Sequence, residues 1–368
     1  MDEIIYDEDV YKEAQDHFLG YPCNMQYDYS KLYDSLKYHF NNVGNPYEES
    51  SYRVNTKNHE RNVLAFFQEL WGFDKNNVWG YITANGTEGN LQAMYIAKLV
   101  FPNSVIYMSD NTHYSIPKIC KLVGVPLIIV KSQENGEMDY ADFEQKLIAN
   151  KDKSAIINAN LGTTMLGATD NTREIYRILS KHNKENDYYM HADGALMGFV
   201  LPFIEKDIFF KKCIHSISVS GHKFLGIPFP CGIFMMEKRF LDLIKLHIEV
   251  IGSSDCTISG SRNGHSALFL DYIIEEKGYD GFEKDIMECI DNAEYLITRM
   301  NRLKEKAWRN QNSLTVVFNK PDMNVVRKWQ LATVGNKSHV IVLPHATKKK
   351  LNSFMRDISI YKTNAIKI

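Results

Sequence analysis

Short apolar runs alternate with helix-periodic segments through the middle of the chain. Several of these runs lack strict alternation of apolar and polar positions, which is typical of strands buried on both faces of a sheet. Their alternation with helical segments over residues 80–240 predicts a largely parallel α/β sheet covered by helices. The expected strands are Val78–Thr83, Val105–Ser109, Leu127–Val130, Ala155–Asn160, Tyr188–Ala192, Ser216–Val219 and Gly232–Met236.

The two ends of the chain have a different pattern. Residues 1–60 are rich in Tyr and Asn, and a long helical stretch is expected at about Ser266–Lys304. Asn310–Ser313 interrupts the pattern before a tail of mixed helices and strands. We therefore expect an N-terminal segment (1–60), a large domain (61–309) and a small α+β C-terminal domain (310–368). The elements expected in the tail are strand Leu314–Phe318, helix Met323–Leu331, strand Val340–Leu343 and helix Thr347–Ile358.

Composition and charge narrow the class of protein. The 368 residues are 44% hydrophobic and carry a net charge of -2, which gives no reason to expect nucleic acid or a membrane surface as partner. No apolar run approaches the ~20 residues that span a bilayer, and the acidic start lacks the apolar core of a secretory signal. The six cysteines lie far apart without a CxxC pair. We expect reduced thiols, no metal site and a cytoplasmic location.

Lys223 and Asp193 are the main candidates for chemistry. Lys223 ends the sequence SGHK after an apolar strand, and Asp193 lies thirty residues earlier in HADGA. Pyridoxal phosphate (PLP) needs a lysine amine that bonds to its aldehyde and a carboxylate that keeps its pyridine nitrogen protonated. A lysine there is more commonly a solvated strand end, and an aspartate a helix N-cap. Together, at the strand ends where open α/β sheets bind ligands, they favour a PLP site.

A phosphate site is expected beside them. Residues 83–90, TANGTEGN, form a strand, a turn and the start of a helix, and free N–H groups at a helix N-terminus bind anions. Gly86 and Thr87 are the expected contacts, and Ser220 and His222 can donate hydrogen bonds to the same phosphate. The turn is neither a Walker A loop nor GxGxxG, which disfavours a nucleotide. An ordinary helix cap is the alternative.

Other segments supply candidate contacts to the cofactor ring. His113 follows a predicted strand and is a candidate to stack on the ring, although a lone loop histidine is more often structural. Thr164, in NLGTT, is a candidate partner of the ring hydroxyl or the substrate carboxylate, with an ordinary turn threonine as the alternative. Ala195 leaves room for a flat ring. Residues 257–265, TISGSRNGH, form a Ser/Gly turn with Arg262, which we interpret as a further anion-type turn.

Six motifs together resemble one family. NGTEGN, DNTHYS, NLGTT, HADGA, SGHKFLG and ISGSRNGH occur in the order found in group II PLP-dependent amino-acid decarboxylases, most similar to the branch of plant serine decarboxylases and bacterial histidine decarboxylases. The resemblance extends from about residue 20 to about residue 358. It implies the aspartate aminotransferase-like fold (fold type I), an obligate homodimer with shared active sites, and a small-molecule amino-acid substrate.

The resemblance also implies residue roles. Lys223 becomes the Schiff-base lysine, Asp193 the pyridinium partner, and His113 the residue stacked on the ring, with Ala195 on its other face. Thr164 would lie near the ring hydroxyl, Gly260 and Ser261 would reach the neighbouring subunit's phosphate, and Tyr21–Pro22 would lie near the substrate. The phosphate contacts would be Asn85, Gly86, Thr87, Ser220 and His222.

One position departs from the family pattern. Related enzymes usually have a tyrosine shortly before GSRNGH, taken to protonate the product carbon, and this chain has Val250 there, which has no proton to donate. His247 is a possible substitute.

We expect decarboxylation of a polar L-amino acid, with serine to ethanolamine favoured and histidine to histamine second. Oxidative deamination to an aldehyde and a PLP-binding protein of weak activity remain alternatives, and an aminotransferase is less expected.

Overall fold

The computed structural model describes residues 7–205 and 213–365, which form two compact units. Within these residues, the small unit contains 7–26, 165–167 and 283–365, and the large unit contains 27–164, 168–205 and 213–282. The division falls inside the long helix α8 (Gly264–Arg302), earlier than the boundary expected near residue 310. The last turns of α8 belong to the small unit, where Tyr295 donates a hydrogen bond of 2.7 Å to Asn352. The segment expected at 1–60 is also shared between the units.

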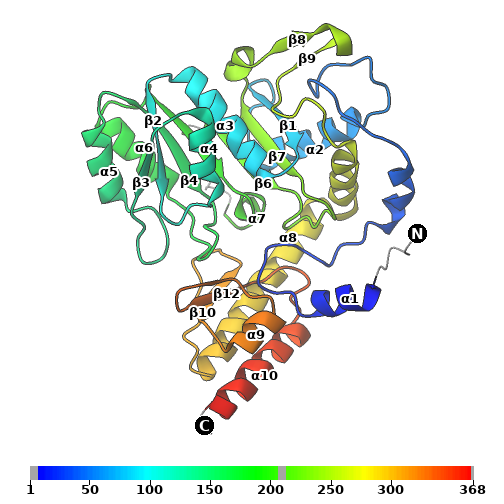
Figure 1. The fold of residues 1–368 in the computed structure, drawn as a ribbon, viewed down its shortest axis with the longest axis vertical. Coiled ribbons are helices and arrows are strands. Elements are labelled where there is room, and N and C mark those ends of the chain that lie inside the picture. Colours follow the sequence, from blue (N-terminus) through cyan, green and yellow to red (C-terminus); the bar gives the residue numbers. More distant parts are fainter. Residues whose placement is uncertain (1–6, 206–212, 366–368) are drawn as a thin grey trace. The chain divides into compact units, whose positions relative to one another are not determined.

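The large unit is built on a mainly parallel sheet (Figure 1). Strand β7 is antiparallel to both of its neighbours, β1 and β6, whereas the remaining neighbours pair in parallel. The expected strands are all present, with ends that shift by one residue at most. In spatial order they are β1 (Val78–Thr83), β7 (Gly232–Glu237), β6 (Ser216–Ser220), β5 (Tyr188–Asp193), β4 (Ser154–Asn160), β2 (Ser104–Ser109) and β3 (Leu127–Val130).

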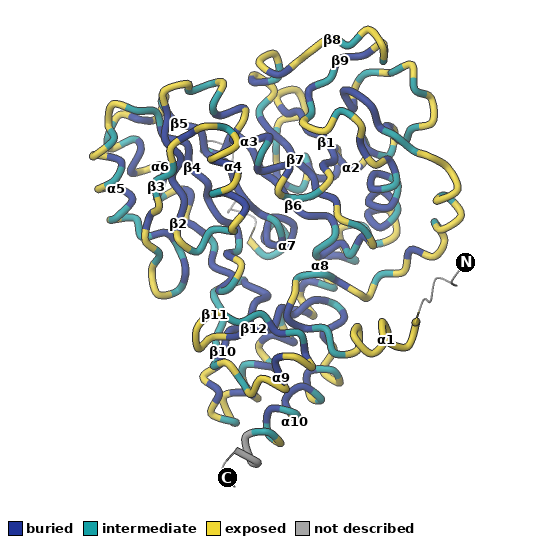
Figure 2. The backbone as a smooth tube through the Cα atoms, in the orientation of Figure 1, coloured by how far each residue is buried: buried dark blue, intermediate teal, exposed yellow. Residues whose placement is uncertain are grey.

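Helices cover both faces of this sheet. A Cβ atom on Gly89 of α3 (Gly86–Val100) would lie 2.8 Å from Cβ of Ser218, and one on Gly198 of α7 (Met197–Ile204) would lie 2.7 Å from Cγ2 of Val219. Successive residues of a strand face opposite sides, so α3 and α7 pack on opposite faces of β6. Burial on both sides explains why the strands lack alternation, and Figure 2 shows the central strands as buried.

The remaining elements of the large unit surround the sheet. The helices are η1 (Ser30–Lys37), α2 (Lys57–Leu70), α4 (Ser115–Val123), α5 (Tyr140–Ala149), α6 (Thr172–Lys181) and η2 (Lys238–Leu243). A hairpin of β8 (Leu246–Ile248) and β9 (Ser253–Asp255), joined by η3 (Glu249–Ile251), was not expected from the sequence because its strands are very short. The continuous helix expected over 266–304 is wrong in one respect: α8 is interrupted at Gly278, whose φ of 58° is left-handed.

The small unit contains an antiparallel sheet with helices. The sheet order is β10 (Thr315–Asn319), β12 (Lys337–Ile341) and β11 (Thr333–Val334), and α1 (Glu8–Asp16), α9 (Met323–Lys328) and α10 (Lys348–Ala365) complete the unit. Strand β12 begins three residues before the expected strand 340–343. The N-terminal segment joins this unit through the hydrogen bond from Ile341 N to the carbonyl oxygen of Leu19 (2.9 Å). None of the described helices is both long and apolar enough to cross a membrane.

A buried histidine makes the stability of the large unit depend on pH. The ring of His215 stacks on Tyr189, and its Nδ1 accepts a hydrogen bond from Met190 N (3.0 Å). Burial, aided by the positive charge of Arg239, lowers the pKa of His215 to about 3. The unfolded chain titrates near 6.5, so below that pH it binds more protons than the folded protein and stability falls.

We predict that this one group removes about 3 kcal/mol of stability between neutral pH and pH 4. In the variant His215→Asn the side-chain oxygen can still accept from Met190 N but does not titrate. Urea unfolding between pH 4 and 7 should therefore show a shallower loss of stability in the variant. Parallel pH profiles for the two proteins would contradict this assignment.

Candidate active site

The carboxyl ends of three parallel strands bring the main candidates together. Asn160 at the end of β4 pairs with Asp193 at the end of β5, and Asp193 pairs with Ser218 near the end of β6. Beyond the strands, Ser220 N donates to the carbonyl oxygen of Ala195 at 3.0 Å. Asp193, half-buried Ala195 and Ser220 therefore lie along one edge of the sheet, where open α/β sheets bind ligands.

Asp193 is a buried carboxylate rather than a helix cap. The residue is 7% exposed, and its Oδ2 accepts a hydrogen bond of 2.8 Å from Nδ2 of Asn90 in α3. The next helix, α7, begins four residues later and has Leu196 at its N-cap without a side-chain cap. The N-cap alternative weighed for Asp193 is therefore wrong.

Lys223 lies in a tight turn directly after β6. Its N–H is 3.4 Å from the carbonyl oxygen of Ser220, and its own carbonyl oxygen accepts from Gly226 N at 3.2 Å. The lysine side chain is half-buried. The neighbouring His222 lies with Nδ1 3.0 Å from the carbonyl oxygen of Cys231, and burial lowers the pKa of His222. A neutral imidazole at this position leaves the positive charge of the turn on Lys223.

His113 lies in the loop between β2 and α4. Its Nδ1 is 2.8 Å from the hydroxyl oxygen of Ser115, and its ring centroid is 4.2 Å from that of Tyr114. Burial lowers the pKa of His113, the negative charge of Asp193 opposes that shift, and the positive charge of Lys223 adds to it. The imidazole of His113 is therefore close enough to Asp193 and Lys223 for both charges to act on its pKa.

The N-terminus of α3 approaches the same strand end. A Cβ atom on Gly86 would lie 2.7 Å from the hydroxyl oxygen of Ser220, so the helix N-terminus lies directly against this side chain. Asn85 is the N-cap, and its Oδ1 accepts from Glu88 N at 3.0 Å. The N–H groups of Gly86 and Thr87, in the first turn, have no partner within the helix. Together with the Ser220 hydroxyl and the helix dipole, these donors fit a phosphate group.

The other expected site residues lie on different segments of the chain. Thr164 is exposed, and Tyr21 and Pro22 belong to the small unit. Gly260 and exposed Ser261 lie in a turn where Ser261 Oγ accepts from Asn41 Nδ2 at 3.2 Å. Within the same chain, the adjacent Ser259 donates to Glu88 in the first turn of α3 (2.6 Å), which places this turn near the α3 N-terminus.

Comparison with known proteins decides the family. Residues 89–320 match the family model described as the pyridoxal-dependent decarboxylase conserved domain. The chain belongs to this family. It is 42% identical to serine decarboxylase 1 of Oryza sativa subsp. japonica over 94% of this chain and 73% of that protein. It is also 42% identical to a histidine decarboxylase of Vibrio anguillarum, over 95% of this chain and 92% of that protein.

The fold comparison agrees with the family. L-methionine decarboxylase from Streptomyces sp. 590 superposes with a TM-score of 0.86 at 23% identity, covering 97% of this chain and 96% of that chain. The expected fold class, the aspartate aminotransferase-like fold type I, is confirmed, as is the resemblance to group II decarboxylases. The protein is a PLP-dependent amino-acid decarboxylase, a carboxy-lyase, and PLP is its cofactor.

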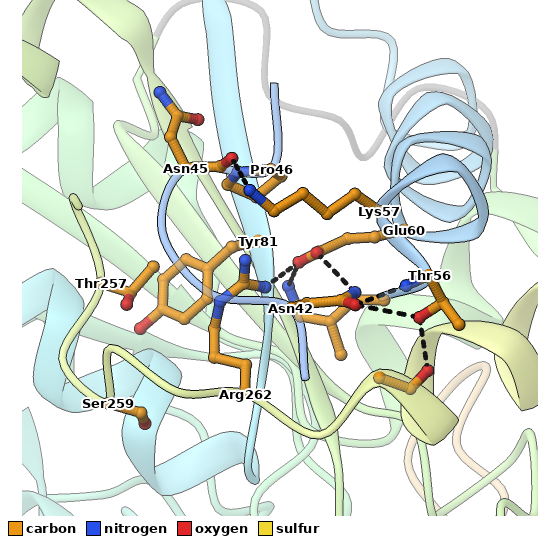
Figure 3. A network of polar contacts seen from close by, with 12 residues as sticks. Asn42, Asn45, Pro46, Thr56, Lys57, Glu60, Tyr81, Thr257, Ser259 and Arg262 are labelled. Atoms are coloured by element: carbon orange, nitrogen blue, oxygen red, sulfur yellow. Dashed lines mark hydrogen bonds and ion pairs between the residues drawn. The ribbon is translucent and has the colours of Figure 1, made fainter. Parts of the chain in front are cut away.

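Arg262 has a different environment in this decarboxylase from the one expected. Instead of standing free as the anion-binding group of its turn, its guanidinium is 3% exposed and forms an ion pair with fully buried Glu60 of α2 (Figure 3). It also donates to the carbonyl oxygen of Gly44 at 2.8 Å and lies over the Tyr81 ring, 5.6 Å from its centroid. The arginine therefore links the turn to the N-terminal part of the large unit.

Glu60 is the hub of this network, and the sequence analysis missed it. Its Oε1 also accepts from Ile82 N in β1 at 2.9 Å, and its Oε2 accepts from Asn42 Nδ2 at 3.0 Å. Beside it, Lys57 is 1% exposed and donates to the carbonyl oxygens of Asn45 and Glu48. Burial and the nearby charge of Arg262 lower the pKa of Lys57. A glutamate in a helical pattern gives no sequence signal of such a role.

We predict that Glu60→Gln destabilises the decarboxylase strongly. The substitution keeps the shape of the side chain but leaves the Arg262 charge buried without its counter-ion, which should cost about 3–5 kcal/mol. Chemical denaturation measures the loss. The matched control is Glu174→Gln, which breaks the exposed ion pair with Arg177 and should cost less than about 1 kcal/mol. Equal, small losses in the two variants would show that the buried pair is not structural.

Proposed function

We propose that this decarboxylase acts on a polar L-amino acid, L-serine first, and that Lys223 carries PLP. The observation that carries the proposal is the grouping of Lys223, Asp193 and His113 beside the N-terminus of α3, where phosphate donors fit. Bound PLP supplies an electron-withdrawing ring that accepts the electron pair left when the carboxylate departs as carbon dioxide.

Each side chain around the ring has a separate proposed role. The Asp193 carboxylate would hold a proton at the pyridine nitrogen through a charge-assisted hydrogen bond. His113 would lie against one face of a bound ring and Ala195 would leave space at the other. Lys223 would hold PLP by condensing with its aldehyde, which releases water, and its amine would be available to move protons near the reacting carbon. The phosphate is held by Gly86, Thr87, Ser220 and the His222 turn, while Thr164 stays a proposed partner of the ring hydroxyl.

Serine and histidine are both supported as substrates. The rice proteins named serine decarboxylase are 41–42% identical to this chain, and the Vibrio anguillarum histidine decarboxylase is 42% identical. We favour serine to ethanolamine and keep histidine to histamine as the second candidate. Incubation of the holoenzyme with each of the twenty amino acids, with carbon dioxide and amine measured together, separates them. Carbon dioxide release from neither serine nor histidine would overturn the substrate proposal.

The cofactor lysine has a direct test. In Lys223→Ala the visible absorption band of bound PLP should disappear, because no amine at the site can bond to the aldehyde. Borohydride reduction of the wild-type holoenzyme followed by peptide mapping should find PLP on the peptide that contains Lys223. The matched control is Lys118→Ala, which removes another cation near His113 and should leave the band intact. Label on a different lysine would refute the assignment.

We also propose a homodimer with shared sites. Exposed apolar side chains in and after η1 support it, since Tyr33, Leu36 and Tyr38 are 55%, 56% and 53% exposed. Tyr21, Pro22, Gly260 and Ser261 are the proposed contributions to the partner's site. Sedimentation of the holoenzyme at micromolar concentration should report two chains, and a fully active monomer would contradict the shared site. A cytoplasmic location stays a prediction.

Val250 is the basis of a prediction about the product. It lies in η3, is 89% exposed, and cannot donate a proton. We predict that the product carbon stays unprotonated long enough for dissolved oxygen to take two electrons from it and become hydrogen peroxide. Hydrolysis by water would then give some aldehyde and ammonia beside the amine. Val250→Tyr should raise the amine-to-aldehyde ratio, as measured by oxygen uptake and product analysis. Amine alone from both proteins, without oxygen uptake, would indicate another donor such as His247.

A further inference from the structure

A closed set of buried polar side chains lies directly beside Asp193. Asn90 of α3 is 3% exposed and donates from Nδ2 to Asp193 Oδ2 at 2.8 Å. Its Oδ1 lies 2.9 Å from Nε2 of His191 and accepts a hydrogen bond of 2.5 Å from Ser218 Oγ. His191 precedes Asp193 by two residues in β5 and is fully buried, so both residues lie on the same face of the sheet.

The hydrogen bonds fix the orientation of the Asn90 amide. If the amide were turned over, its oxygen would face the Asp193 carboxylate, two acceptors would meet, and the Ser218 hydroxyl would lose its acceptor. With Oδ1 facing His191, the imidazole must carry its proton on Nε2. Its Nδ1 then accepts from Ser216 Oγ at 2.9 Å. Each hydrogen bond along the chain Ser216, His191, Asn90, Asp193 thus joins a donor to an acceptor.

The imidazole of His191 is uncharged in this set of hydrogen bonds. Burial lowers the pKa of His191 to about 4, although the negative charge of Asp193 opposes that shift. At neutral pH the imidazole therefore contributes an N–H group and no charge. An imidazolium here would compete with the pyridinium for the same carboxylate, whereas the neutral ring only holds Asn90 in place.

We propose that Asn90, held by His191 and Ser218, is the positioning residue that sets the Asp193 carboxylate for the cofactor. Asn90 occupies Oδ2 and fixes the side-chain rotamer, which leaves the other oxygen to the pyridine nitrogen. This inference rests on the proposed role of Asp193. Because Asn90 acts on the ring nitrogen through Asp193 and contacts no substrate in this arrangement, its loss should lower kcat and leave KM nearly unchanged.

The test compares Asn90→Ala with a matched variant, Asn62→Ala. Asn62 also donates an amide hydrogen bond to a buried carboxylate, that of Asp271 at 3.1 Å, but between α2 and α8. For Asn90→Ala we expect kcat to fall about 10- to 100-fold, the range of a lost hydrogen bond to a charged group. The ¹⁵N resonance of labelled PLP in the substrate-free holoenzyme should move toward that of unprotonated pyridine. Asn62→Ala should change neither quantity.

Two further variants keep the test decisive. Ser218→Ala removes one donor to Asn90 and leaves the bond to Asp193, so it should lower kcat by about 3- to 10-fold, and it decides the matter if Asn90→Ala does not fold. Asp193→Asn tests the underlying role and should lose about two orders of magnitude or more of kcat. If Asp193→Asn loses activity strongly but Asn90→Ala keeps the wild-type kcat and ¹⁵N resonance, the role of Asn90 is overturned while that of Asp193 stands. Ser218→Ala is judged in the same way if Asn90→Ala does not fold. Near-normal turnover in Asp193→Asn would overturn the proposed role of Asp193 itself.

Discussion

The close packing of α3 on β6 is the constraint on which the site depends. Two glycines one turn apart, Gly86 and Gly89, lie against Ser220 and Ser218, and a Cβ atom on Gly89 would lie 2.8 Å from Cβ of Ser218. Because the helix is held this close to the strand, its N-terminus lies at the strand end. Asn90, one residue after Gly89, lies within hydrogen-bond distance of Asp193. The proposed phosphate donors and the proposed support of the carboxylate therefore depend on the same packing contact. A larger residue in place of Gly89 would disturb both at once.

The Glu60–Arg262 network also holds segments in place around the N-terminus of α3. It ties the turn 257–261 to α2 and β1, and the same turn reaches α3 because Ser259 donates to Glu88. Glu88 in turn accepts from Ala84 N, directly before the N-cap (2.7 Å). Buried ion pairs add little net stability when both charges must be desolvated, but removing one partner is costly. Their effect is to allow only one arrangement of the segments that flank the α3 N-terminus.

The sequence predicted those parts of the molecule that are determined by neighbouring residues in the chain. Buried strands such as Val78–Thr83 could be predicted because unbroken apolar runs signal burial on both faces. Motifs such as SGHK and HADGA could be predicted because each lies at the carboxyl end of its strand. The hairpin β8–β9 could not, since strands of three residues carry no periodicity. The partners of Arg262 and Asp193 could not either, because Glu60 and Asn90 meet them only after distant segments pack. Asn90 stood inside a motif already interpreted as a phosphate turn, and nothing in its spacing pointed to a carboxylate.

The charges around the site explain why this arrangement suits a cationic ring. Asp193 is buried, and one amide hydrogen bond from Asn90 compensates only part of the cost of removing a carboxylate from water. The nearest histidines do not supply the missing charge, because burial lowers the pKa of both His191 and His113 and keeps them neutral. A protonated pyridine nitrogen would supply it, and the carboxylate would in turn hold that proton. If Asp193 has this proposed role, binding of PLP would itself stabilise Asp193, and the occupancy of the site would be coupled to the stability of the strand ends that form it.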